Sequence, residues 1–214
     1  PALRCTAAHD LLFDFGFARG VMPRACCALG IAEGQVREIA VLSRVGKPTC
    51  FVVTDIDEES EPPTVWLSRT AVQLRAQEAL LSSLSPGDII PAAVTHLEPF
   101  GAFVDIGCGL PSLIGIENLS VSRIYHPSDR LTVGQSIRAA VRSVDVENRR
   151  ITLTHRELLG TWEENAALFA AGETVRGIVR SVEPYGVFIE LAPNLSGLAE
   201  NREGLTPGTL VSVY

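Results

Sequence analysis

The stretch "EPFGAFVDI" (Glu98–Ile106) places two phenylalanines three residues apart around a glycine, and "EPYGVFIEL" (Glu183–Leu191) repeats that arrangement 85 residues later. Only 6% of the chain is aromatic, so a second aromatic pair behind the same Glu-Pro indicates a repeated structural unit. At the same offset, and without a gap, Gly87 meets Gly172. The chain is therefore expected to contain at least two copies of one unit.

A second similarity extends the repeat to both ends of the chain. "VGKPTCFVVTDID" (Val45–Asp57) matches "VGQSIRAAVRSVD" (Val133–Asp145), and "LTPGTLVSVY" (Leu205–Tyr214) is a third version of the same segment. We predict a degenerate copy over 1–70, a helical linker over 71–84, a complete copy over 85–157, a second helical linker over 158–171, and a third copy over 172–214 that stops in its fourth strand. Both linkers are rich in Ala, Leu and Glu, so each is expected to be one short amphipathic helix.

The complete copy has the period of two that is typical of β-strands with one buried face. Ile137, Ala139 and Val141, for example, alternate with residues of the opposite face. We predict five strands in this copy, at 89–97, 100–106, 112–116, 136–144 and 150–155. Five short antiparallel strands fit a small closed barrel, which leaves no sheet edge exposed. The predicted fold class is therefore all-β, with tandem five-stranded barrels joined by short helices.

"PGDIIPAAVTHLEPFGAFVDIG" (Pro86–Gly107), followed by "HPSDRLTVGQSIRAAVRSVDVENRRITLT" (His126–Thr154), resembles the S1 RNA-binding domain family. The likeness covers the complete copy, the third copy as far as it runs, and the second half of the first copy. It implies S1-type OB-fold barrels that bind single-stranded RNA. It also implies a binding face made of two second-strand aromatics, a third-strand histidine, and an aspartate and a basic residue near the last hairpin.

Carried onto this sequence, the resemblance implies RNA contacts from Phe100, Phe103, Asp145 and Arg149 or Arg150 in the complete copy, and from Tyr185 and Phe188 in the third copy. The histidine is absent, because the matching positions hold Gly115 and Glu200. The first copy has no clear aromatic-Gly-x-Phe strand. Its nearest candidate is "FDFGFARG" (Phe13–Gly20), whose register the sequence leaves open.

Stacking chemistry supports the same surface independently. Single strands are bound by stacking unpaired bases on exposed aromatic rings, which OB barrels carry on strands two and three. A regular strand would direct Phe100 and Phe103 to opposite faces, one into the core and one to the surface. A bulge at Gly101 would bring both onto one exposed face, and this is the arrangement we expect. Trp66 and Trp162 are expected to pack a barrel and a linker helix instead of stacking on bases.

Arginines supply further candidates in a chain whose net charge is −7. All 18 cations except Lys47 are arginine, the residue that both pairs with phosphate and stacks on bases. The additional candidates for RNA contact are Arg138 and Arg142 on one strand of the complete copy, and Arg176 and Arg180 on the first strand of the third copy. Phosphate contact and pairing with surface carboxylates both remain open for them. His96 is expected to be an ordinary surface residue.

Several functional classes lack sequence support. The chain has no phosphate-binding loop, nucleophile elbow, HExxH or paired-carboxylate motif, so no catalysis, cofactor or small-molecule substrate is expected. No apolar run approaches the ~18–20 residues that span a bilayer, and we see no secretory signal, so no membrane partner is expected. The five cysteines include no CxxC pair, which argues against a metal site and fits buried free thiols in a reducing compartment.

The leading hypothesis is a non-enzymatic, cytoplasmic, bacterial protein that binds single-stranded RNA or mRNA, with the ribosome as a further expected partner. The rival is a protein-docking module that anchors to the ribosome and has little affinity for RNA. The acidic balance, the missing histidine and the degenerate first copy favour that rival. A third interpretation is an accessory array of an RNA-processing enzyme.

Overall fold

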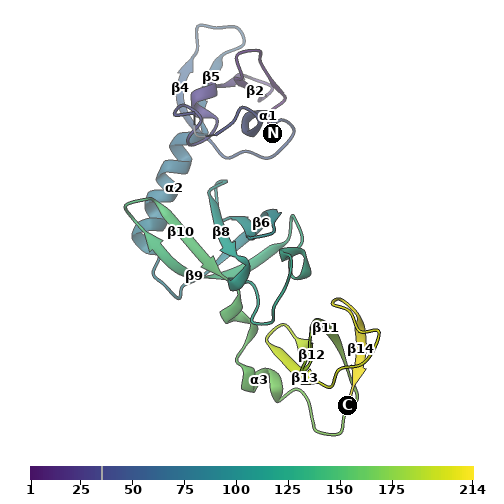
Figure 1. The fold of residues 1–214 in the computed structure, drawn as a ribbon. Helices are drawn as coiled ribbons and strands as arrows, with labels where there is room; N and C mark the ends of the chain where they lie inside the picture. The colour runs from purple at the N-terminus through teal and green to yellow at the C-terminus, as the bar shows by residue number, and fades with distance from the viewer. Residues whose placement is uncertain (35) are drawn as a thin grey trace. The chain divides into compact units, whose positions relative to one another are not determined.

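The computed structural model describes residues 1–34 and 36–214, and its β-strands form three sheets (Figure 1). The described chain divides into two compact units. The first contains Pro1–Ser83 with Gly107–Leu110, and the second contains Leu84–Ile106 with Pro111–Tyr214. The second unit therefore holds two of the three sheets.

The middle sheet is a closed barrel in the order β10-β8-β7-β6-β9, with β9 also paired to β10. Its strands are β6 (Ile89–Glu98), β7 (Gly101–Asp105), β8 (Pro111–Gly115), β9 (Ser136–Asp145) and β10 (Arg150–Thr154). The five predicted strands are confirmed to within one residue at each end. The expectation of wholly antiparallel pairing was wrong at one seam, because β8 and β10 run parallel. The long connection over 116–135, with the 3₁₀ turns η2 (Ile116–Asn118) and η3 (Pro127–Asp129), carries the chain across before β9 begins.

The other two sheets repeat this strand order. In the first unit the order is β1-β2-β3-β5-β4, from β1 (Arg4–Cys5), β2 (Leu11–Asp14), β3 (Arg19–Met22), β4 (Val52–Asp57) and β5 (Thr64–Ser68). The short helices η1 (Arg24–Cys26) and α1 (Ile39–Leu42) lie between β3 and β4. The C-terminal sheet has the order β13-β12-β11-β14, from β11 (Val175–Glu183), β12 (Gly186–Ala192), β13 (Leu195–Ala199) and β14 (Leu210–Val213).

One hydrogen bond recurs in all three sheets and ties the start of the fourth strand to the first. A glycine N–H donates to a backbone carbonyl in three matched pairs: Gly46 to Ala2, two residues before β1 (2.9 Å), Gly134 to Val94 on β6 (2.8 Å) and Gly208 to Val179 on β11 (2.8 Å). The three glycines have φ of 75°, 88° and 91°, a left-handed conformation that other residues rarely adopt. The sequence repeat therefore reflects a shared backbone geometry.

Each sheet packs one face into its own core. The barrel core contains Val94, Val104, Ile114, Val141 and Leu153, all at most 2% exposed. The first unit buries a comparable cluster that includes Leu11, Phe13, Met22, Ile31 and Leu67. The C-terminal sheet fully buries only Val179, Val187 and Ile189 in its cluster. Its core is thus the smallest of the three.

The first linker is a helix, α2 (Arg69–Ser83), but its buried residues are polar. Arg69 and Gln73 are buried, and the Gln73 side chain accepts from Leu29 N–H and donates to the carbonyls of Cys108 and Gly109. The expectation of an amphipathic helix was therefore wrong. The buried face of the helix packs against main-chain carbonyl and N–H groups. These groups need hydrogen-bond partners when buried, so polar side chains occupy this face where an apolar stripe was expected.

The second linker is not one helix, as the sequence suggested. It contains a 3₁₀ segment, η4 (Arg156–Leu159), and a five-residue helix, α3 (Trp162–Ala166). Gly160 lies between them at φ 82°, and a capping box of Thr161 and Glu164 starts the new helix. Trp162 is 59% exposed and Trp66 is 37% exposed, so neither tryptophan has the packed position that we expected.

The cysteines are free thiols with different degrees of burial. Cys27 is fully buried, and desolvation raises the pKa of its thiol to about 12. Cys50 is exposed. Buried thiols were predicted correctly for Cys27 and incorrectly for Cys50. Across residues 1–34 and 36–214, the structure contains no helix long and apolar enough to cross a membrane.

Thiol labelling at pH 8 should separate these two cysteines. Cys50 is expected to react within minutes, whereas Cys27 should stay unmodified until the first unit unfolds, because both access and thiolate formation are suppressed there. Mass spectrometry of the labelled peptides measures both. Labelling of Cys27 at the rate of Cys50 would contradict the described packing.

The recurring glycine bond predicts a difference between two substitutions. A Cβ would meet nothing at Gly134 or at Gly197, but only Gly134 has a positive φ. Gly134→Ala should therefore lower the stability of the barrel by about 1–2 kcal/mol. Gly197→Ala, the matched control, should leave the C-terminal sheet unchanged or slightly more stable. Hydrogen exchange of β9 and β13 amides measures both effects, and equal effects would contradict the conformational argument.

Candidate nucleic-acid interface

The aromatic pair of the barrel forms one surface cluster. Phe100 lies in the turn before β7 and is 56% exposed, while Phe103 is half-buried on β7 itself. The ring centroids are 6.0 Å apart and the rings are nearly perpendicular. This edge-to-face arrangement confirms that both rings share a surface. It leaves the Phe100 ring accessible to a flat aromatic ligand.

The backbone cause of this arrangement differs from the expected bulge at Gly101. The pairing of β7 is regular from Gly101 onwards, and the irregularity falls on the neighbouring strand between Val94 and His96. Gly101 instead permits a close approach, because a Cβ there would collide with the carbonyl oxygen of Ile114 on β8. Phe100 shares the face because it belongs to the turn and not to the strand.

A row of side chains crosses the barrel beside this pair. Strand register places His96, Phe103, Leu113, Thr152 and Ser143 side by side across β6, β7, β8, β10 and β9. The His96 ring lies 6.5 Å from the Phe103 ring and hydrogen-bonds Glu98 at 2.7 Å. The hydroxyl groups of Ser143 and Thr152 form a hydrogen bond of 2.6 Å. The row therefore continues the aromatic surface into a polar one.

Sequence reasoning missed His96 as a member of this surface. Its position two residues before Glu98, on the strand that pairs with the phenylalanine strand, was the available signal. The β6 irregularity decides which face it occupies, and nothing in the sequence marks that irregularity. The third-strand histidine remains absent, since Gly115 occupies its place at the end of β8.

The hairpin between β9 and β10 carries the charged candidates. The side chain and backbone N–H of Asn148 both donate to Asp145, and these bonds lower the pKa of the Asp145 carboxyl. Arg150 is exposed and stands opposite Asp145 in the strand register. Arg149 is exposed at φ 51°, in the turn itself. An ionised acceptor and two guanidinium groups thus lie at one end of the barrel.

The two arginines of β9 occupy different places. Arg142 is the extra residue of a bulge between Val141 and Ser143, and lies 3.7 Å from Glu117 in an exposed ion pair. Arg138 pairs with Pro91, five residues before His96 on β6, which is about 16 Å along the strand. Only Arg142 is therefore close to the row that contains Phe103.

The C-terminal sheet repeats the aromatic geometry. The Tyr185 and Phe188 rings are 6.3 Å apart at 88°, and Tyr185 is 71% exposed. Their neighbours in the register are Ser181 and Leu198. Arg176 is exposed on β11, but the Arg180 side chain is only 9% exposed and contacts Glu190 and Asp129. The two arginines that the sequence treated alike are thus separated by burial.

The first unit presents a different row at the matching register. Arg4, Leu12, Val21, Trp66 and Asp55 take the places of the barrel residues from His96 to Ser143. The stretch Phe13–Gly20 is not an aromatic strand-two start, because it runs from the end of β2 through the hairpin into β3. Phe13 itself belongs to the core.

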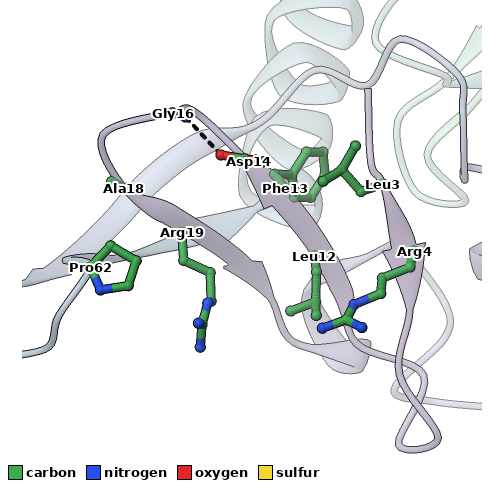
Figure 2. Close-up of a pocket in the computed structure, with 9 residues that line it drawn as sticks. All are labelled: Leu3, Arg4, Leu12, Phe13, Asp14, Gly16, Ala18, Arg19 and Pro62. Atoms are coloured by element: carbon green, nitrogen blue, oxygen red, sulfur yellow. Dashed lines mark hydrogen bonds between the residues drawn. The ribbon is translucent and has the colours of Figure 1, made fainter.

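A hollow of about 280 Å³ lies beside the row of the first unit. Figure 2 shows Arg4, Leu12 and Arg19 on one side of the sheet, together with Pro62. Asp14 is engaged with the backbone N–H of Gly16 at 2.7 Å. The lining of this hollow contains two cations, Asp14, aliphatic groups and one ring, Phe13, which belongs to the core.

Comparison with known proteins agrees with this geometry. The S1 RNA binding domain family matches residues 83–156. The small ribosomal subunit protein bS1 of Staphylococcus aureus is 31% identical over 90% of this chain and 48% of its own length. The protein of the same name from Leuconostoc lactis is 38% identical over 88% of this chain and 43% of its own length. The small ribosomal subunit protein bS1 homolog of Bacillus subtilis is 35% identical over 72% of this chain and 41% of its own length.

The chain thus spans about half the length of the curated relatives that it matches. The match to the family coincides with the closed barrel and with its aromatic row. Residues 83–156 of this chain therefore belong to the S1 RNA-binding domain family.

Proposed function

We propose that the chain is a single-stranded RNA-binding protein whose middle barrel makes most of the contact with RNA. The observation that carries this proposal is the exposed edge-to-face pair of Phe100 and Phe103 on a barrel that also presents a hairpin with Arg149 and Arg150. Stacking on aromatic rings and pairing of guanidinium groups with phosphate are the two interactions that hold single strands.

Each group of the surface has a distinct task in this proposal. One base stacks on the exposed face of Phe100, and Phe103 with His96 supports the next base along the row. The Asp145 carboxylate, which is ionised at neutral pH like any ordinary aspartate, accepts hydrogen bonds from amino groups of a base. Arg142, Arg149 and Arg150 lie along the phosphates.

The three copies contribute unequally. We propose that the third copy, 172–214, binds RNA through Tyr185 and Phe188, without the buried Arg180 and without Arg176, which lies five residues before Ser181 on β11 and so about 16 Å from the ring pair. Arg138 lies too far from the row that contains Phe103 to contact the same few nucleotides of an RNA strand. The first copy, 1–70, has Leu12 at the position of Phe103, so it is assigned no stacking role on this surface.

The cellular setting is taken from the relatives. Because proteins named small ribosomal subunit protein bS1 are similar over most of this chain, we propose a cytoplasmic, bacterial protein that associates with mRNA and the ribosome. We also propose that it acts by binding alone, as a non-enzymatic protein. The docking rival predicts no RNA binding at low salt, so the measurements below separate the two.

Removal of the ring pair should weaken RNA binding strongly. Phe100→Ala with Phe103→Ala is expected to reduce affinity for single-stranded RNA at least tenfold, since stacking contributes ~1–3 kcal/mol per base. Phe100→Ala alone should cost about fivefold, and it leaves the core intact because Phe100 lies in an exposed turn. Fluorescence anisotropy with a labelled RNA of about 12 nucleotides measures both.

Phe17→Ala is the matched control for this series, because Phe17 is 79% exposed but lies in the first unit, outside the proposed surface. Its affinity should equal that of the wild type. Undiminished binding by the double variant, or an equal loss in the control, would contradict stacking on Phe100 and Phe103.

The hairpin arginines should determine part of the salt dependence. For single strands, the slope of log K against log salt falls by about 0.7 for each phosphate contact that is lost. Arg149→Ala with Arg150→Ala should therefore flatten the slope by about 1.4. Arg24→Ala, which removes an arginine paired with Glu38 in the first unit, should leave the slope unchanged. A slope that is unaltered in the double variant would exclude these phosphate contacts.

A further inference from the structure

The connection between β8 and β9 of the barrel contacts the C-terminal sheet within the second unit. Ser120 Oγ donates to the carbonyl of Pro193 at 2.8 Å, and the hydroxyls of Ser122 and Ser196 are 2.9 Å apart. Tyr125 Oη donates to the carbonyl of Arg180 at 3.0 Å. This connection is therefore the part of the barrel that meets the C-terminal sheet.

Four charged side chains complete this contact, and we call them the junction network: Asp129, Arg130, Arg180 and Glu190. Glu190 accepts from both arginines, from Arg130 Nη2 at 2.6 Å and from Arg180 Nε at 2.5 Å. Arg180 Nη1 also lies 3.4 Å from Asp129 Oδ2. Positive and negative side chains alternate along the network. Asp129 and Arg130 belong to the connection, Arg180 to β11 and Glu190 to β12.

Three of the four side chains of the junction network are nearly buried, whereas the Asp129 side chain is 33% exposed. The side chains of Arg130, Arg180 and Glu190 are only 10%, 9% and 6% exposed. Buried charges carry a large desolvation cost, which is offset only when every partner is in place. A relative movement of the two sheets would break the Arg130–Glu190 and Arg180–Asp129 pairs, while Arg180 and Glu190 would stay paired within the C-terminal sheet, so the two crossing pairs favour a single arrangement.

The middle barrel lacks the arginine of this network but has a carboxylate at the position of Glu190. At the 85-residue offset of the repeat, Arg180 corresponds to Thr95 and Glu190 to Asp105. Thr95 donates to the carbonyl of Phe103, within its own barrel. Glu190 also follows the buried Val187 and Ile189 on a strand that otherwise packs a core. Arg180 is thus specific to the contact between the sheets, whereas a carboxylate at the position of Glu190 is common to both copies.

Resting on the function proposed above, we propose that the junction network holds the middle barrel and the C-terminal sheet as one rigid body, so that a single RNA strand engages both aromatic pairs at once. Phe100 and Tyr185 are both exposed, so both pairs are accessible in this arrangement. When two sites have a fixed separation, binding at the second becomes intramolecular and the affinity for a long strand rises. Without the network, the two sheets would be joined by the covalent linker, residues 155–174, and by the hydrogen bonds of Ser120, Ser122 and Tyr125.

RNA length provides the test. A site on one OB barrel holds about 4–16 nucleotides, so oligouridines of about 6 and about 24 nucleotides distinguish one site from two. Glu190→Gln should lower affinity for the long RNA about tenfold and leave that for the short RNA within twofold. Glu203→Gln is the matched control, because it makes the same charge change at an exposed position of the C-terminal region and should alter neither.

Nitrogen-15 relaxation of the full chain tests rigidity without RNA. In the wild type, amides of β6–β10 and of β11–β14 should report one rotational correlation time, and in Glu190→Gln they should report two. Arg130→Met, outside the strands of both sheets, should reproduce this result if Glu190→Gln fails to fold. Two correlation times in the wild type would overturn the rigid body, and equal losses for both RNA lengths would overturn the shared strand.

These readings also separate this inference from the proposed function. If neither oligouridine binds the wild type, the RNA-binding function fails and the shared strand with it. The correlation times would still support or overturn the rigid junction, because they do not depend on RNA.

Discussion

The hydrogen bond from a left-handed glycine to a first-strand carbonyl is the constraint on which the other features depend. In the barrel it joins Gly134 to Val94 and thereby fixes where β6 and β9 meet. Val94 is buried, and the irregularity of β6 begins at the next residue. That irregularity turns His96 toward Phe103, so the position of the aromatic row follows from the closure of the barrel.

The same glycine hydrogen bond occurs in all three sheets, although only the middle sheet is a closed barrel, and the side chains at matching positions differ. At one register position the barrel carries Phe103, the C-terminal sheet Phe188 and the first unit Leu12. At this register position the shared backbone thus carries an aromatic ring in two copies and a leucine in the first. This difference explains why the first copy resembled the others only in its second half.

Much of the fold could be predicted from periodicity and repeats, and the site only in part. The five barrel strands follow from alternation, because that pattern depends on local burial. The parallel pairing of β8 with β10 and the role of His96 depend on long-range register, which no local pattern encodes. The break at Gly160 was visible as a glycine before a Thr-x-x-Glu capping box, but helix propensity outweighed it. Arg180 and Arg176 have the same residue type and strand, and only tertiary contacts distinguish them.

The central claim is that single-stranded RNA lies on the row that contains Phe103, and amide chemical shifts test it most directly. Titration of an RNA of about 12 nucleotides into nitrogen-15-labelled protein should shift residues 96, 100–103, 113 and 143–152 more than the rest of the barrel. Shifts confined to the row of Arg4, Leu12 and Trp66 in the first unit, or no shifts at low salt, would contradict the account.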